Sequence, residues 1–133
     1  MSDKPLVSVV IPTYNRKEKL IKLIRSILQS NYPSEKLEIV VVDDASTDGT
    51  YKMVKNLYSQ AKVIRIDKEV FPAKSRDLGA RCATGEYLFF IDDDCMVLAD
   101  TITYLTETVL GIGEKAGIIA PVITYEKNPC KVW

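Results

Sequence analysis

Three consecutive carboxylates, Asp92, Asp93 and Asp94, directly follow an apolar run at residues 87–91. The run is short, aromatic and partly β-branched, which is typical of a buried strand rather than a helix. Adjacent anions repel each other by about 1 kcal/mol per pair even in water, and a bound cation relieves that repulsion. Because carboxylate oxygens suit hard divalent ions, the pattern predicts a Mg²⁺ or Mn²⁺ site where a strand leaves the core. The alternative is a solvated acidic turn.

Polar loops also follow two earlier predicted strands. Continuous β-branched runs at residues 7–11 and 38–42 are typical of parallel strands that are covered on both faces. If the strand at 87–91 lies beside the first of these, all three loops meet at the carboxyl edge of one sheet, where ligands bind in such folds. The residues that would then converge on one cleft are Pro12, Thr13, Tyr14, Asn15, Asp43, Asp44, Asp92, Asp93 and Asp94.

Segments with helical spacing alternate with the predicted strands along the chain. This β-α-β order predicts one α/β domain over residues 1–133, with three layers (α/β/α) around a mainly parallel, Rossmann-like sheet. Helices are predicted from Lys17 to about Ser30, through Met53, Val54 and Leu57, over 72–82 and over 101–110. Further strands are predicted at 63–66 and 117–122, and residues 124–133 give no clear prediction.

Composition narrows the classes of function. The 133 residues are 47% hydrophobic, and the 18 basic and 18 acidic residues give a formal net charge of +0, which argues against non-specific binding to nucleic acid. The absence of histidine excludes an imidazole base, a Ser-His triad and a His-based zinc site. The three cysteines match no metal-binding or disulfide spacing, which favours free thiols in a reducing compartment.

No apolar run approaches the ~20 residues that a membrane helix needs, and the first residues do not form a signal peptide. We therefore expect a soluble chain without a transmembrane segment. The expected location is the cytoplasm, including the cytoplasmic face of the membrane.

Together these stretches resemble one family, the inverting glycosyltransferases of family 2, which have the GT-A fold. The resemblance covers about residues 6–100, in family order and spacing. It implies a UDP- or GDP-linked sugar donor, a carbohydrate or lipid-linked acceptor and a role in cell-envelope polysaccharide or glycolipid biosynthesis. It also implies a Mn²⁺ or Mg²⁺ ion at a D-x-D motif. The matching stretches are residues 7–16, 38–50, 75–79 with 85–87, and 92–94.

The resemblance also implies roles for individual residues. Arg76 would lie near the diphosphate, Asp92 and Asp93 would face the ribose and the metal, and Asp94 would coordinate the metal together with Asp92. Asp43 would accept a hydrogen bond from a base N–H, and Asp44 would help to shape the same pocket. The remaining residues of the base and ribose pocket would be Pro12, Thr13, Tyr14 and Asn15.

The chain departs from the family pattern in two ways. Asp77 stands where the family usually has asparagine, in the stretch Arg76-Asp77-Leu78-Gly79. Family members also carry a downstream half that binds the acceptor and supplies a carboxylate base. We expect this chain to lack that half, and we assign no catalytic base.

Two other functions remain open at this point. A non-catalytic nucleotide-sugar-binding module would keep the donor site without a base. A receiver-type signalling domain would use an acidic pair such as Asp43-Asp44. A receiver, however, places that pair after its first strand and needs a lysine at the end of its last strand, where this chain has Pro121 and Val122.

Overall fold

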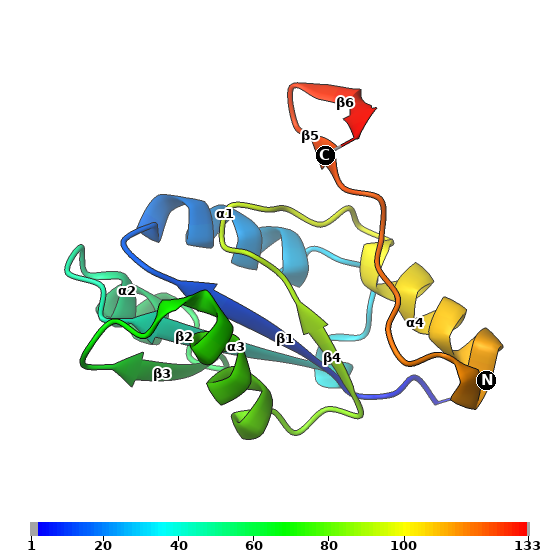
Figure 1. The fold of residues 1–133 in the computed structure, drawn as a ribbon, viewed down its shortest axis with the longest axis horizontal. Coiled ribbons are helices and arrows are strands. Elements are labelled where there is room, and N and C mark those ends of the chain that lie inside the picture. Colours follow the sequence, from blue (N-terminus) through cyan, green and yellow to red (C-terminus); the bar gives the residue numbers. More distant parts are fainter. Residues whose placement is uncertain (1–2, 133) are drawn as a thin grey trace.

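Four parallel strands, in the order β3-β2-β1-β4, form the sheet that positions the polar loops (Figure 1). The structure is a computed structural model and describes residues 3–132. It confirms the predicted α/β fold with a mainly parallel sheet, and it places the predicted strand at 87–91 beside the first strand. The strands are β1 (Val7–Thr13), β2 (Leu37–Asp44), β3 (Lys62–Ile66) and β4 (Tyr87–Phe90).

The central strand β1 is buried along its whole length. Its alternate side chains serve two different layers, because successive residues of a strand point to opposite faces. Val9 and Ile11 belong to the core shared with α1, whereas Val10 faces α3, where it lies against Gly79. Coverage of both faces explains why β1 is apolar without alternation.

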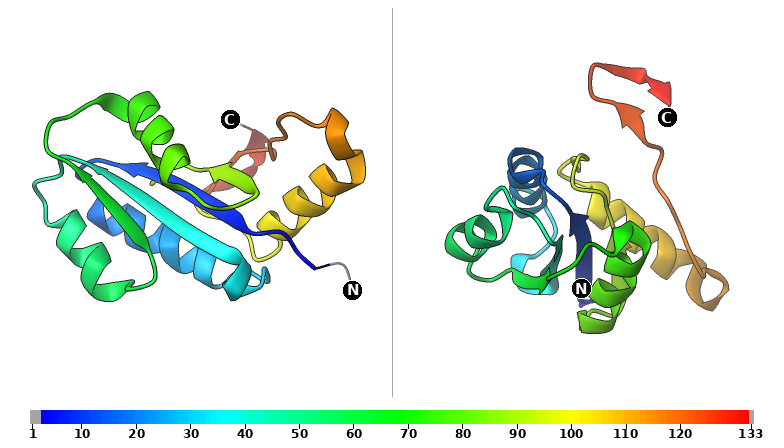
Figure 2. Two further views of the ribbon diagram at one scale, coloured as in Figure 1. Left: turned by 90° about the horizontal axis from the view of Figure 1, so that it is seen from below. Right: turned by 60° about the vertical axis from the view of Figure 1, so that its left-hand side comes forward.

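Helices cover both faces of the sheet (Figure 2). The helix α3 (Phe71–Cys82) packs on one face, and α1 (Lys17–Leu28), α2 (Thr50–Leu57) and α4 (Thr101–Ile112) contribute to the core on the other. None of these helices, nor any other in residues 3–132, has the length and apolar character needed to cross a bilayer. The inner stripe of α1 consists of fully buried residues at helical spacing: Leu20, Leu23, Ile24 and Ile27.

The helix α3 lies unusually close to the sheet because it carries a glycine at the contact. A Cβ atom built on Gly79 would lie 2.5 Å from Val10 Cγ1 and 3.0 Å from Val42 Cγ2, so no larger residue fits without a shift. This close packing fixes the height of α3 above β1 and β2. It therefore also fixes the positions of Ser75 and Arg76, one turn earlier on the same helix.

The prediction of a strand at residues 117–122 was wrong. The chain leaves α4 through a short 3-10 turn, η2 (Gly113–Lys115), runs on without regular structure, and then forms a two-stranded antiparallel hairpin. The hairpin strands are β5 (Thr124–Tyr125) and β6 (Asn128–Val132), which lie apart from the sheet in Figure 1 and in the right-hand view of Figure 2. An apolar run becomes a strand only where a neighbouring strand offers hydrogen bonds. Within the described residues, 117–122 has no such neighbour, and Pro121 lacks an N–H to donate.

Candidate functional site

A cavity of about 440 Å³ lies at the carboxyl ends of the strands. Its volume is within the range typical of small-molecule sites. It adjoins the junction of β1 and β4, where the order of the strands reverses, which is where ligands bind in open α/β sheets. Its walls are formed by Pro12, Thr13, Tyr14, Arg16, Asp44, Glu69, Pro72, Ser75, Arg76, Asp92, Asp93 and Asp94.

The cavity brings together every predicted site residue except Asn15 and Asp43. Four of its residues were not predicted. Arg16 directly follows the polar loop after β1, and Pro72 and Ser75 precede Arg76 on the same helix, so position along the chain could have indicated these three. No sequence signal pointed to the fourth, Glu69, which lies in the loop before α3.

Asp93 is the most deeply buried of the three consecutive aspartates. Its Oδ2 accepts a hydrogen bond of 2.8 Å from the Thr13 hydroxyl, and its Oδ1 accepts one of 3.1 Å from Arg16 Nη1. Burial raises the pKa of Asp93 above its usual value, while the contacts with Thr13 and Arg16 oppose that rise. Asp93 is thus anchored to β1 through Thr13 and to the following loop through Arg16.

Asp94 shares the same guanidinium nitrogen. Its Oδ2 lies 3.0 Å from Arg16 Nη1, so one nitrogen bridges two adjacent carboxylates. Asp93 and, less strongly, Asp94 raise the pKa of Arg16. Asp93 Oδ1 and Asp94 Oδ2 therefore stabilise a positive charge together at this point of the cavity wall.

Asp92, the first of the three, points to another arginine. It forms an ion pair with Arg76, which connects the loop after β4 to α3. Both side chains are partly exposed, so this contact is open to exchange with a ligand.

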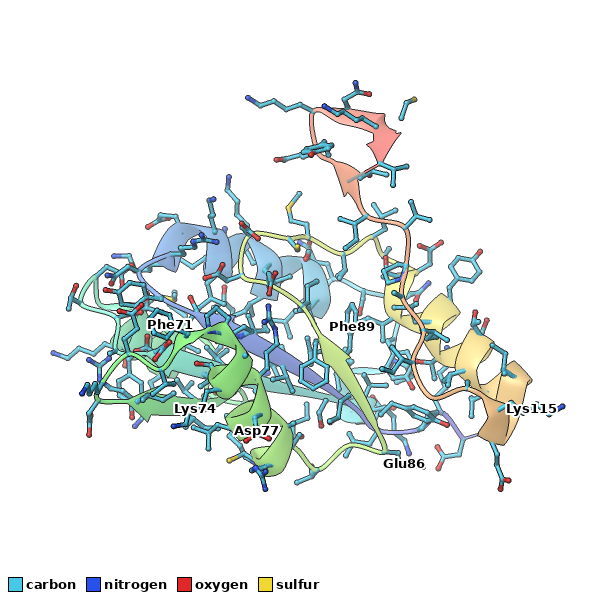
Figure 3. All side chains as sticks on the ribbon, in the orientation of Figure 1. Phe71, Lys74, Asp77, Glu86, Phe89 and Lys115 are labelled. Carbon is cyan, nitrogen blue, oxygen red and sulfur yellow. The ribbon has the colours of Figure 1, made fainter. Side chains whose placement is uncertain are left out.

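Asp44 holds the start of α3. Its two carboxylate oxygens accept hydrogen bonds from the backbone N–H groups of Val70 (2.8 Å) and Phe71 (2.9 Å). These donors lie at the positive end of the helix dipole, which stabilises an anion. Phe71 has a φ of 69°, an uncommon conformation for a bulky residue, and it is exposed at the beginning of α3 (Figure 3).

Asp43 and Asn15 support the site from outside its lining. The fully buried Asp43 accepts hydrogen bonds from Arg65 Nη1 (2.6 Å) and from the Ser46 backbone N–H (3.2 Å), which occupies both of its oxygens. Asn15 connects the loops after β1 and β2, because its Oδ1 accepts from the Thr47 N–H at 2.7 Å. Direct contact of either residue with a base remains a prediction.

Asp77, which stands where the family usually has asparagine, lies outside the cavity lining. Its carboxylate is exposed and pairs with Arg81 at 3.0 Å, one turn further along α3 (Figure 3). This additional carboxylate therefore places no charge in the wall of the cavity.

The cavity suits a divalent metal that is bound together with a ligand. Within residues 3–132 no three acidic, histidine or cysteine side chains are arranged to hold an ion by themselves. Two carboxylate oxygens nevertheless converge on one cationic nitrogen, at Arg16. Mg²⁺ is usually held by one or two carboxylates plus the phosphates of a substrate, and the oxygens of Asp93 and Asp94 fit that requirement.

The sequence profile of glycosyl transferase family 2 matches residues 8–128. Glycosyltransferase AglE of Haloferax volcanii is 30% identical over 115 residues, which are 84% of this chain and 38% of AglE. The crystal structure of Staphylococcus aureus TarS 1-349 in complex with UDP-GlcNAc has a TM-score of 0.70 and 31% identity, covering 74% of this chain and 29% of that chain. Mannosyltransferase PcManGT from Pyrobaculum calidifontis, in complex with GDP-Man and Mn²⁺, has a TM-score of 0.71 and 32% identity, covering 78% of this chain and 32% of that chain.

The chain therefore belongs to glycosyl transferase family 2, and its structural neighbours are GT-A glycosyltransferases. It spans less than half the length of the curated relatives it matches, between 17% and 40% of each. The receiver-type alternative does not fit, because receivers have the strand order 2-1-3-4-5 whereas this sheet has the order β3-β2-β1-β4.

Proposed function

We propose that this chain is the donor-binding domain of a metal-dependent glycosyltransferase. It would bind a UDP- or GDP-linked sugar, which the whole enzyme transfers to an acceptor with inversion. The observation that carries the proposal is one cavity that joins the three aspartates, Asp44 and two arginines at the junction of β1 and β4. The neighbours' complexes with UDP-GlcNAc and with GDP-Man and Mn²⁺ support a ligand of this class.

The composition of the walls suggests how the donor lies. Pro12, Tyr14 and Asp44 offer an apolar surface and a carboxylate acceptor, which suit a nucleobase and its N–H groups. Arg76, next to the first turn of α3, suits the diphosphate, because guanidinium groups bind phosphate with two parallel hydrogen bonds. Asp94 is proposed as the metal ligand, with Asp92 and Asp93 as the neighbouring carboxylates toward the ribose and the metal.

The metal would supply electrostatic stabilisation of the departing diphosphate. The protein's own residues would orient the donor: Arg76 would leave Asp92 for the phosphates, and Asp44 would hold the α3 end of the cavity. A base for the acceptor hydroxyl is not assigned, since four of the five carboxylates in the cavity already accept hydrogen bonds from the protein. This engagement of the carboxylates is also what favours the second candidate function, a nucleotide-sugar-binding module without transfer activity.

The acceptor is proposed to be a carbohydrate or a lipid-linked saccharide of cell-envelope synthesis, reached at the cytoplasmic face of the membrane. The support is the similarity to TarS, a poly(ribitol-phosphate) beta-N-acetylglucosaminyltransferase. Nucleic acid is not a proposed partner, because the chain has a formal net charge of +0.

Calorimetric titration of UDP and GDP, in Mn²⁺ and in chelator, tests the proposal. We expect one of the two nucleotides to bind only with the metal. Asp94→Asn should weaken that binding roughly tenfold or more, which corresponds to the loss of a charge-assisted contact. Asp77→Asn is the matched control, since it removes the same charge outside the cavity. Equal binding in chelator would contradict the metal's role, and absence of binding under both conditions would contradict the donor site itself.

A further inference from the structure

Arg16 lies between two of the three carboxylates at which the proposed metal would bind. Its Nη1 lies 3.1 Å from Asp93 Oδ1 and 3.0 Å from Asp94 Oδ2. The proposed function gives this arginine no role, although its side chain forms part of the cavity wall.

We propose that Arg16 is the internal counter-cation of Asp93 and Asp94, which a divalent metal must displace when it binds with the donor. Arg16 is thus a positioning residue, because it keeps the two carboxylates together before the metal arrives. This inference rests on the metal dependence that the proposed function assumes. The displacement of Arg16 has two consequences for that function. The metal alone would bind weakly, and the metal and the nucleotide would each strengthen the binding of the other.

Geometry makes simultaneous binding of the arginine and the metal unfavourable. A Mg²⁺ ion requires carboxylate oxygens at about 2.0–2.1 Å. The same two oxygens are within 3.1 Å of Arg16 Nη1, so an ion between them would meet the guanidinium at very short range. The repulsion between two cations at that range is strong in a partly buried site. The arginine has to leave before the ion can use both carboxylates.

The backbone allows Arg16 to move and keeps Asp93 in place. Arg16 is exposed and stands at the N-cap position of α1, where its backbone carbonyl accepts the first helical hydrogen bond, from the Leu20 N–H at 3.0 Å. The side chain can therefore swing away without disturbing the helix. Asp93, in contrast, remains hydrogen-bonded to Thr13 through Oδ2, which keeps its carboxylate in place when Arg16 leaves Oδ1.

The nucleotide supplies what the displaced arginine needs. Arg16 and the proposed diphosphate ligand Arg76 line the same cavity, and a diphosphate offers acceptor oxygens to both. A metal that binds alone loses the stabilisation of the Arg16 ion pairs, whereas a metal that arrives with a diphosphate allows Arg16 to form new ones. Linkage then requires each ligand to strengthen the other's binding.

The test compares three proteins in a titration with Mn²⁺ alone, followed by Mn²⁺ at saturating UDP or GDP. The proteins are the parent chain, Arg16→Gln and Lys17→Gln. Lys17 is the matched control: it is the adjacent cation, at the first position of α1, and its ammonium contacts the Asp48 carbonyl rather than Asp93 or Asp94. We expect Arg16→Gln to bind Mn²⁺ alone roughly 5–10-fold more tightly than the parent, within the usual range of coupling between sites. Lys17→Gln should match the parent.

The inference is overturned if Arg16→Gln binds Mn²⁺ alone no more tightly than Lys17→Gln while nucleotide binding still requires Mn²⁺; the proposed function would then survive. If the parent binds nucleotide equally in chelator, the metal dependence fails and the inference fails with it.

A second measurement does not depend on the folding of Arg16→Gln. Saturating Mg²⁺ and nucleotide should shift the Arg16 side-chain Nε–H resonance of the parent, assigned with Arg16→Lys, and leave that of the exposed Arg81 unchanged. An unshifted Arg16 resonance would overturn the inference.

Discussion

Five carboxylates line the cavity, and four of them already accept hydrogen bonds from groups of the protein. These partners are two arginines, the Thr13 hydroxyl and two backbone N–H groups at the start of α3. Under the proposed function, an incoming donor would therefore mostly exchange contacts rather than fill unpaired positions. The contacts of Arg16 with Asp94 and of Arg76 with Asp92 are partly exposed on both sides, so they are the contacts that a charged ligand can replace at least cost.

The neighbours Asp43 and Asp44 show what the sequence could not resolve at this scale. Both were expected at the base pocket, yet only Asp44 reaches the cavity. Side chains alternate along a strand, so one of two adjacent residues must point elsewhere. Asp43 is the one that points elsewhere, because Arg65, which is distant in sequence, pairs with its buried carboxylate.

Asp43→Asn should lower the free energy of unfolding by about 1–3 kcal/mol, because the buried Asp43 loses its charge-assisted bond to Arg65. Urea unfolding followed by circular dichroism measures the change. Asp77→Asn, an exposed substitution of the same type, should leave the midpoint unchanged. If Asp43→Asn unfolds at the parent's urea concentration but binds nucleotide more weakly, Asp43 contacts the ligand after all, as the sequence suggested.

At the scale of elements, Glu38 joins three strands to the loop before β4. Its carboxylate accepts hydrogen bonds from Ser8 of β1, from Lys62 of β3 (3.3 Å) and from the Thr84 N–H (2.8 Å). Burial alone would raise the pKa of Glu38, but these hydrogen bonds outweigh burial and hold its pKa below the usual value of 4.5. Folding therefore favours the ionised carboxylate.

The sign of the pH effect follows from that depressed pKa. The stabilisation by Glu38 is fully present above the unfolded-state pKa and is lost as the pH falls through the lower folded-state pKa. We expect the parent to exceed Glu38→Gln in stability by about 1–2 kcal/mol at neutral pH. The difference should shrink in acid. Urea unfolding of both proteins across this pH range measures it, and a constant difference would contradict the assignment.

The packing of α3 on the sheet gives another prediction at this scale. Gly79→Ala should destabilise the chain by about 1–3 kcal/mol, because the new methyl group meets Val10 and Val42. Binding of Mn²⁺ and nucleotide should also weaken, since α3 carries Arg76. Gly111→Ala is the control: it lies within α4 with nothing within 4 Å of the added Cβ, so helix propensity should stabilise it by up to about 1 kcal/mol. Equal effects of the two substitutions would contradict the close contact.

Elements were predictable from the sequence where local patterns decide them. The stripe of α1 and the apolar runs of β1 and β2 are local signals, and the structure confirms all three. The run at 117–122 has the same composition as a strand, but strand formation depends on a partner that is distant in sequence. The pairing of Asp93 with Arg16, 77 residues apart in sequence, is non-local for the same reason.

At the scale of the whole molecule, the cavity and the carboxyl-terminal hairpin belong to different parts of the chain. All residues of the cavity lining lie between Pro12 and Asp94. The hairpin formed by β5 and β6 projects from the three layers in Figure 1 and in the right-hand view of Figure 2. The family profile nevertheless extends to residue 128, so the match to the family includes much of this projecting segment.

A chain shortened to residues 1–116 should therefore retain both the stability and the ligand binding of the α/β layers. Among the side chains that the structure describes in 117–132, every one except Ile119 is exposed, so their removal uncovers little apolar surface. We expect the free energy of unfolding to change by no more than about 0.5 kcal/mol, as for other surface changes. The affinity for nucleotide in Mn²⁺ should not change, because no residue after Asp94 contributes to the cavity wall.

Urea unfolding and calorimetry of the two chains measure these quantities. A large loss of stability would mean that residues 117–132 pack on the domain in solution, and a selective loss of nucleotide affinity would mean that this segment reaches the donor.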